Sequence, residues 1–314
     1  MNGKLICIAG PTASGKTGLS VRLAEALDAE IVSCDSMQIY RHMDIGTAKP
    51  TKDEMRGIRH HMLDVADPWE DYSVGKYVQQ ADACVQDILR RGRPVIVVGG
   101  TGLYSESLVL GRGFAPVPST GQRQRLEARA LEEGPEALRQ ELLRIDPEAY
   151  DRIAATDSRR IIRALEVFYE TGKTITEHNR LTQLQPPRYD CLWLGLDDED
   201  RSVLYDRINR RVDDMLRQGL MEEIDRLVSM GVPRTATAMQ AIGYKEFLME
   251  KQGELSHTEA VELVKQRSRN YAKRQLTWFR RNREIHWLIR GQQDNSDTIF
   301  SAARQAVRKF APDA

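Results

Sequence analysis

Short apolar runs alternate with amphipathic stretches over the first hundred residues, a pattern that predicts a parallel α/β sheet. The apolar runs predict strands at residues 4–9, 30–34 and 94–98, and the amphipathic stretches predict helices at residues 16–27 and 74–91. The last of these strands is apolar without interruption, which is typical of a strand buried on both faces.

The middle of the chain follows a helical pattern instead. It begins at about Phe114, where Pro116 and Pro118 mark a break, and ends at Pro187. Charged stretches with helical periodicity predict helices at residues 123–131, 135–145 and 158–171. We therefore expect a helical insertion at residues 114–187, between two parts of a sheet domain at residues 1–113 and 188–314.

The sheet pattern returns after the insertion. The sequence predicts a strand at residues 189–196 and helices at residues 201–218, 222–230 and 258–282. The last helix opens with Ser256-His257-Thr258-Glu259, a capping-box sequence. The tail after Gly291 is polar, and we expect it to end in one loosely packed helix.

The composition is that of a folded globular chain. Of 314 residues, 41% are apolar and 29% are charged. No apolar run approaches the roughly 18 residues of a membrane-spanning helix, and the run Leu5–Ala9 is too short for a signal sequence, so we expect a cytoplasmic protein with no membrane contact. The four cysteines lie far apart without C-x-x-C spacing, which favours reduced, structural thiols over zinc ligands.

Charge is balanced overall but not locally. Lysine plus arginine and aspartate plus glutamate both number 46, so bulk charge gives no argument for nucleic acid. Residues 265–283 carry eight basic side chains and no acidic one. Lys265, Arg269 and Lys273 form an i, i+4 stripe, and because a solvated helix face usually interleaves acids, we expect this stripe to contact a phosphate or polyanion.

The chemistry begins at a glycine-rich loop. Residues Gly10-Pro11-Thr12-Ala13-Ser14-Gly15-Lys16-Thr17 fit the P-loop pattern G-x-x-x-x-G-K-[ST] between a predicted strand and a predicted helix. In that context backbone N–H groups surround a phosphate, Lys16 adds a charge and Thr17 offers a hydroxyl to magnesium. The sequence therefore predicts an α/β, P-loop NTPase-like parallel sheet core with an inserted helical domain.

The identity of the bound phosphate is less clear, because the expected strand-end acid is missing. A P-loop ATPase normally carries an aspartate after a second apolar strand, but residues 95–98 are followed by Gly99-Gly100-Thr101-Gly102. Asp35 follows the strand at residues 30–34, which we expect beside the P-loop strand, at the edge where such sheets bind ligands. Asp35 is then a general base, a metal ligand or a turn residue, and both ATP and a diphosphate ester fit the loop.

Other polar residues have competing interpretations. The Thr101 hydroxyl either orients a substrate or caps the next helix. Adjacent histidines His60-His61 point in different directions, which favours hydrogen bonding over metal binding. Arg207 and Arg211 share a helix face and suit two oxygens of one leaving group, with pairing to Asp206 or Asp214 as the alternative. A further basic cluster, Arg159, Arg160 and Arg163, lies on the insertion.

Taken together, the motifs resemble one known family, the bacterial tRNA dimethylallyltransferases (tRNA isopentenyltransferases). VGGTGLY at residues 98–104, DSMQIY at residues 35–40 and YAKRQLTWFR at residues 271–280 are highly specific to it. The remaining matches follow in the family's order: GPTASGKT at residues 10–17, DIGTAKP at 44–50, RRIIRALEVF at 159–168 and QAIGYKEF at 240–247. We expect no zinc-finger extension of the kind that the eukaryotic members carry.

The resemblance implies transfer of a dimethylallyl group from its diphosphate to the exocyclic amine of the adenosine just 3′ of the anticodon (tRNA position 37). Its partners are then tRNA and dimethylallyl diphosphate, its cofactor is Mg²⁺ on Thr17, and we expect a monomer. The implied catalytic residues are Asp35 as base with Thr101, Lys16 and Arg211. The implied diphosphate site is Gly10, Pro11, Thr12, Ala13, Ser14, Gly15, Lys16, Thr17 and Arg207.

For tRNA, the resemblance implies contacts along the core and the insertion, which resembles the family's arm for the anticodon stem. These are Asp35, Ser36, Met37, Gln38, Thr101, Arg123, Arg159, Arg160, Ile161, Ile162, Arg163, Gln240, Lys273 and Arg274. The stretch before Arg123 is shorter than in the family, so Arg125 can take its place. Two other classes stay open: an ATP-dependent nucleoside or nucleotide kinase, and a P-loop RNA-binding protein without chemistry.

Overall fold

The computed structural model describes residues 3–112 and 120–312, which form two compact units. The core unit comprises residues 1–111 and 188–314, and the helical unit comprises residues 112–187. The predicted break at Pro116 and Pro118 lies outside the described residues. No helix within residues 3–112 and 120–312 is both long enough and apolar enough to cross a membrane.

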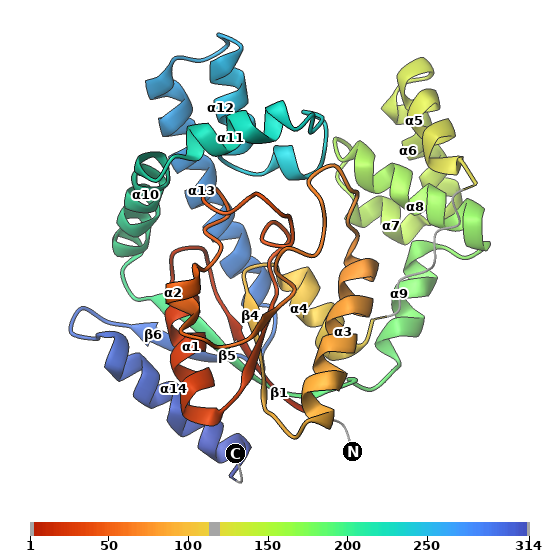
Figure 1. Ribbon diagram of the computed structural model, residues 1–314. Helices are drawn as coiled ribbons and strands as arrows, with labels where there is room; N and C mark the ends of the chain where they lie inside the picture. The colour runs from red at the N-terminus through yellow and green to blue at the C-terminus, as the bar shows by residue number, and fades with distance from the viewer. Residues whose placement is uncertain (1–2, 113–119, 313–314) are drawn as a thin grey trace. The chain divides into compact units, whose positions relative to one another are not determined.

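A parallel sheet forms the centre of the core unit, which confirms the predicted α/β fold (Figure 1). In the described part of the chain it has six strands in the order β3-β2-β4-β1-β5-β6, and every pair is parallel. The strands are β1 (Lys4–Ala9), β2 (Glu30–Ser33), β3 (His60–His61), β4 (Val95–Gly99), β5 (Asp190–Asp198) and β6 (His286–Arg290). The apolar runs of β1, β4 and the middle of β5 are buried, as the sequence predicts.

One expectation about strand order is wrong. The sequence favours β2 beside β1, but β4 lies between them and pairs with both. The chain leaves β2 and returns through α3 (Val74–Arg90) into the space beside β1. The reason is burial: the uninterrupted apolar strand β4 has neighbours on both sides at the centre of the sheet. Asp35 still reaches the carboxyl edge of the sheet, one strand further from the P-loop.

Helices cover the sheet and extend beyond it. The helices of the core unit are α1 (Lys16–Leu27), α2 (Lys52–Met55), α3, α4 (Gly102–Leu110), α10 (Arg201–Arg217), α11 (Leu220–Ser229), α12 (Tyr244–Lys251), α13 (His257–Phe279) and α14 (Ser296–Phe310), with a short 3-10 turn η1 (Ala238–Gln240). Ser256 caps α13 with Glu259, as its sequence predicts. The tail helix α14 is not loosely packed, because Ile299, Ala303 and Val307 are buried in one cluster with α1 and the sheet.

The helical unit has its own core. It contains α5 (Gln122–Glu132), α6 (Pro135–Ile145), α7 (Pro147–Arg152), α8 (Ser158–Thr171) and α9 (Ile175–Gln183). Leu126, Leu138, Leu142 and Leu165 are buried together with Ile161 and Ile162. The side chains of Ile161 and Ile162 face this interior, while neighbouring arginines of α8 do not, and a contact of this segment with tRNA stays a prediction.

Candidate active site

The glycine-rich loop lies between β1 and α1, where the motif requires it. Gly10 and Gly15 have positive φ angles of 150° and 89°, and Ala13 has a φ of 61°, which is uncommon for a residue with a side chain. Lys16 Nζ donates a 2.6 Å hydrogen bond to Pro11 O across the loop. Burial and the nearby Arg211 lower the pKa of Lys16 to about 7, against the opposing charge of Asp35. An anion in the loop would favour the charged lysine.

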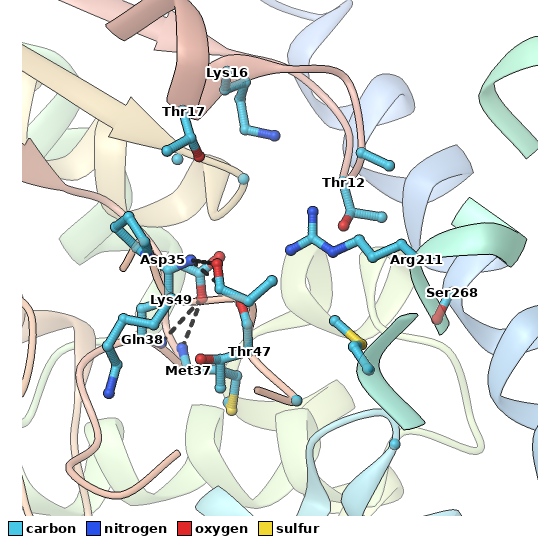
Figure 2. A pocket seen from close by; sticks show the side chains of 18 of the residues that line it. Thr12, Lys16, Thr17, Asp35, Met37, Gln38, Thr47, Lys49, Arg211 and Ser268 are labelled. Carbon is cyan, nitrogen blue, oxygen red and sulfur yellow. Dashed lines mark hydrogen bonds between the residues drawn. The ribbon is translucent and has the colours of Figure 1, made fainter. Parts of the chain in front are cut away.

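The loop opens into a cavity of about 1030 Å³ within the core unit. Figure 2 shows Thr12, Lys16 and Thr17 on one side, with Asp35 and Arg211 pointing into the same space. Residues 35–38, 44–51 and 240–243 contribute to the lining, together with α10 and α13. The wall mixes charged groups with apolar side chains such as Ile208, Val212 and Val264. The cavity thus offers room for an anion, an apolar group and a planar base.

Asp35 begins a turn at the end of β2. Its Oδ1 accepts hydrogen bonds from Met37 N at 2.9 Å and Gln38 N at 3.3 Å, so the interpretation as a turn residue is correct for this oxygen. Oδ2 makes no hydrogen bond to any residue that the structure describes. The turn fixes the orientation of the carboxylate and leaves one oxygen available on the cavity side.

Thr101 lies behind this turn and does not cap α4 through its side chain. Its Oγ1 accepts a 3.0 Å hydrogen bond from Ser36 N and lies 3.3 Å from Ser36 Oγ. A hydrogen bond also joins its side chain to Tyr271, whose pKa burial raises to about 12, with Asp35 adding to the effect. The capping alternative is wrong, and Thr101 instead holds the turn that carries Asp35.

Arg207 and Arg211, both on α10, lie in different surroundings. Arg211 lines the cavity, and burial lowers its pKa while the charges of Asp35 and Glu54 oppose that shift. Arg207 Nη2 bonds Asp198 at the end of β5. It therefore pairs with Asp198 and not with Asp206 or Asp214, because α10 turns Arg207 toward the sheet; its contact with the diphosphate stays a prediction. Arg211 is the arginine that can reach a leaving group.

Residues 44–49 form a cavity wall that the sequence analysis missed. Glu223, which is 1% exposed, accepts hydrogen bonds from the backbone N–H groups of residues 44, 45 and 46 at 2.8, 2.8 and 3.0 Å. Lys49 Nζ bonds Asp44 at 2.7 Å and Asp64 at 2.6 Å. Gln38 Nε2 donates to Thr47 O and Ala48 O, at 3.3 and 3.1 Å. The motif at residues 44–50 marks this segment in the sequence, but nothing in the motif predicts its contact with the buried Glu223 of α11.

The missing strand-end acid has a steric explanation. A Cβ atom on Gly99 would lie 2.0 Å from Cys34 O, because β4 and the end of β2 approach closely at this point. No side chain fits there. Position 99, directly after the apolar run of β4, therefore cannot carry the aspartate that a P-loop ATPase normally has at the end of such a strand.

Two residues of the basic stripe on α13, Lys265 and Arg269, bond side chains of α10, whereas Lys273 is exposed. Lys265 Nζ bonds Asp213 at 2.7 Å, and Arg269 Nη1 bonds Asn209 Oδ1 at 2.6 Å. Lys273 Nζ lies 5.6 Å from the centroid of the Tyr205 ring. Lys265 thus pairs with an acidic side chain of α10, which a count of the charges on α13 alone does not include. Arg274 and Gln240 line the cavity, and Gln240 Nε2 donates to Arg234 O at 2.7 Å.

The arginines of the helical unit fall into two groups, those that bond the buried Glu166 and those that do not. Arg123 and Arg163 both bond Glu166, at 3.0 and 2.9 Å. Arg159 and Arg160 are exposed at the start of α8, and Arg160 lies 3.3 Å from Asp157. The structure thus brings Arg123 and Arg163 together around the buried Glu166, although Arg123 is itself an exposed residue like Arg125, Arg159 and Arg160.

The histidines do not form a metal site. His60 Nδ1 lies 2.9 Å from Ile58 O, and His61 Nε2 lies 2.7 Å from Glu30 Oε2, which confirms the hydrogen-bonding interpretation. Within residues 3–112 and 120–312, no group of three or more histidine, cysteine or acidic side chains could hold a metal. All four cysteines are free.

The comparisons point to one family. A family model described as IPP transferase matches residues 38–282, and one described as Isopentenyl transferase matches residues 3–70. The chain is 42% identical to the tRNA dimethylallyltransferase of Acetivibrio thermocellus, over 98% of each chain, and 45% identical to that of Geobacter metallireducens, over 91% and 92%.

Two solved structures give the same result. The tRNA isopentenylpyrophosphate transferase of Bacillus halodurans is 39% identical with a TM-score of 0.74, covering 99% of this chain and 98% of that one. A eukaryotic dimethylallyltransferase acting on tRNA is 31% identical with a TM-score of 0.83, covering 99% and 80%.

Proposed function

The chain belongs to the IPP transferase family, and we propose that it is a tRNA dimethylallyltransferase. It transfers a dimethylallyl group from dimethylallyl diphosphate to the exocyclic amine of the adenosine just 3′ of the anticodon and releases diphosphate. The observation that carries this proposal is the single cavity into which the phosphate-binding loop and Asp35 both open. One end binds an anion, and the other offers an oxygen that can accept a proton.

The diphosphate of the donor binds to the glycine-rich loop. The N–H groups at the start of α1 and the helix dipole favour an anion there. Lys16 and Arg211 face the same position from two sides and add positive charge (Figure 2). Both cations lose hydration by burial, so they interact strongly with a phosphate oxygen in this cavity. The apolar wall near Ile208 and Val212 then accepts the dimethylallyl end.

Magnesium fits the donor set at the start of α1. The Thr17 hydroxyl lines the cavity, and magnesium usually takes few protein ligands when substrate phosphates and water supply the others. When bound, it would neutralise charge on the diphosphate. The closed position at Gly99 agrees with a metal held chiefly by substrate and Thr17, without a strand-end carboxylate.

The transfer step exchanges one bond for another. The amine nitrogen forms a bond to the allylic carbon as that carbon's bond to the diphosphate oxygen breaks. Asp35 Oδ2 accepts a proton from the amine, which is a weak nucleophile without such help. Lys16, Arg211 and the loop N–H groups stabilise the negative charge that develops on the leaving diphosphate.

The tRNA must present its adenosine to a cavity in the core unit. Extruding a stacked base costs a few kcal/mol, which contacts to neighbouring bases and phosphates must offset. We assign that task to Gln240 and Arg274 at the cavity and to Arg159 and Arg160 on the helical unit. We place the reaction in the cytoplasm, and the free cysteines agree with a reducing compartment.

A transfer assay without ATP, run beside a phosphorylation assay with ATP, tests this function. Labelled dimethylallyl diphosphate, Mg²⁺ and bulk tRNA should give labelled tRNA with no requirement for ATP. Labelled ATP with tRNA or nucleosides should give no phosphorylated product. ATP-dependent phosphorylation without prenyl transfer would instead support the kinase, and RNA binding without turnover would support the non-catalytic alternative.

A further inference from the structure

One buried amide connects two loops of the cavity. Gln275 on α13 is 5% exposed. Its Oε1 accepts a 2.9 Å hydrogen bond from Thr12 N, and its Nε2 donates a 2.9 Å hydrogen bond to Gly100 O. Burying an amide costs free energy unless its ends find partners, and here both ends do. Because one partner is a donor and the other an acceptor, the amide has a single favourable orientation.

The turn after β4 is shaped to receive this side chain. A Cβ atom on Gly100 would lie 2.2 Å from Gln275 Nε2, and one on Gly102 would lie 2.2 Å from the Trp278 ring. Gln275 and Trp278 are three residues apart and therefore share a face of α13. The glycines of the turn and the two side chains of the helix thus form one close contact between distant parts of the sequence.

On its other side, Gln275 supports the phosphate-binding loop. Thr12 immediately precedes Ala13, whose φ of 61° is unfavourable for a residue with a side chain. The hydrogen bond to Thr12 N fixes the backbone next to that strained residue. The Ala13 side chain packs against a buried cluster that includes Ala272 and Leu276 of the same helix. One face of α13 therefore defines the shape of the first half of the loop.

Gly100 leads directly to the proton-accepting side of the cavity. The next residue, Thr101, donates its N–H to Cys34 O at 3.2 Å and accepts from Ser36 N at 3.0 Å. These bonds hold the turn that carries Asp35. Gln275 is consequently the side chain that joins the diphosphate-binding loop to the Asp35 turn.

We propose that Gln275 is a positioning residue that sets the spacing between the diphosphate site and the Asp35 side of the cavity. This inference rests on the proposed transfer reaction, in which the reacting carbon lies at the diphosphate and the amine lies near Asp35. A misplacement of about 1 Å can reduce such a reaction about 100-fold. Gln275 touches neither reacting group, so its effect passes through Thr12 and Gly100.

Three variants test the proposal. Gln275→Met keeps the length of the side chain but removes both hydrogen bonds, and it should lower kcat/KM about 10- to 100-fold. Gln275→Glu keeps the acceptor for Thr12 N but, when ionised, lacks the donor for Gly100 O. Protonation restores that donor, so the activity of this variant relative to wild type should rise as the pH falls. Gln266→Met makes the same chemical change at an exposed position of α13 and is the matched control.

The pH comparison uses activity ratios, because Lys16 lines the same cavity in every variant and its titration affects wild type as well. A flat ratio for Gln275→Met and a rising ratio for Gln275→Glu are expected at saturating substrates. For both Gln275 variants, the tRNA dissociation constant should lie within about twofold of that of the Gln266→Met control, and the melting temperature within a few degrees. A side chain needed only for stability would not give a pH-dependent rescue at constant tRNA affinity.

A double-mutant cycle gives an independent test. Gly100→Ala places a methyl group against the amide and should impair transfer in the wild type, whereas it should add little in a Gln275→Ala background. Equal losses in both backgrounds, or wild-type kcat/KM for Gln275→Met, would overturn the proposal. If wild type itself fails to transfer, the proposed function fails, and the affinity of the variants for inorganic diphosphate still decides whether Gln275 supports the loop.

Discussion

Replacing Asp35 by Asn separates the roles of its two oxygens. In the Asp35→Asn variant the amide oxygen can still accept from the backbone N–H groups of Met37 and Gln38, so the turn at the end of β2 should persist. The second oxygen, which makes no hydrogen bond to a described residue, becomes an NH₂ group. The variant therefore removes basicity on the cavity side while leaving the local fold in place.

The expected loss follows from the role of a general base. Such a base contributes about 10²- to 10⁴-fold to the rate, which corresponds to about 3 to 5 kcal/mol of activation free energy. A second effect is electrostatic: the charge of Asp35 raises the pKa of Lys16, so its removal should lower that pKa further and weaken diphosphate binding at neutral pH. Saturating donor removes this second effect from the measured rate.

Single-turnover transfer at saturating donor, Mg²⁺ and tRNA is the assay for Asp35→Asn. Asp53→Asn, the same change at an exposed position of α2, is the control and should retain the wild-type rate. If Asp35 is instead a magnesium ligand, diphosphate binding weakens and excess metal restores activity. A rate for Asp35→Asn near that of wild type would refute the assignment of Asp35 as base.

Three further changes test other parts of the cavity and the surface. Arg211→Gln should lower kcat/KM about 100-fold, because it removes a contact with the leaving group. Arg207→Gln should chiefly lower the melting temperature, because it removes the close partner of the buried Asp198. If the two assignments are wrong, steady-state kinetics and thermal melts will show the reverse. Since Lys16 is charged below its pKa of about 7, the affinity for inorganic diphosphate, measured by calorimetry, should fall as the pH rises through about 7. After the titration of diphosphate itself is subtracted, the Lys16→Arg variant should show a flatter dependence on pH. Identical profiles for the two proteins would contradict the expectation. Replacing the exposed Arg159 and Arg160 by Gln should reduce the salt slope of tRNA binding by roughly 0.7 to 0.9 per lost phosphate contact, and an unchanged slope would remove the helical unit from RNA binding.

The sequence predicts the local elements of this fold better than their arrangement. The strand β1, the P-loop and helix α1 are correct to the residue, because their periodicity and turn chemistry are local. The order of β2, β4 and β1 is not a local property, since each strand is apolar enough for either place. The close packing of the tail helix α14 is hard to predict, because Ile299, Ala303 and Val307 form a narrow buried face within a polar stretch.

The same limit applies to the candidate site. The glycine-rich loop, Asp35 and Arg211 carry recognisable chemistry and are found in one cavity. The sequence does not predict the partners of Arg207 and Lys265 in the structure, because Asp198 and Asp213 lie on other elements that meet them only in the folded chain. Gln275 lies within the motif at residues 271–280, but the motif does not predict its role, because a buried amide is identified by the backbone groups it bonds and not by its neighbours along the chain.

Mass analysis of the modified tRNA tests the central claim most directly. After incubation with dimethylallyl diphosphate and Mg²⁺ in the absence of ATP, nuclease digestion should place one dimethylallyl group on the exocyclic amine of the adenosine 3′ of the anticodon, with one diphosphate released for each group transferred. A prenyl group on another nucleoside, diphosphate release without RNA modification, or no modification without ATP would contradict the account.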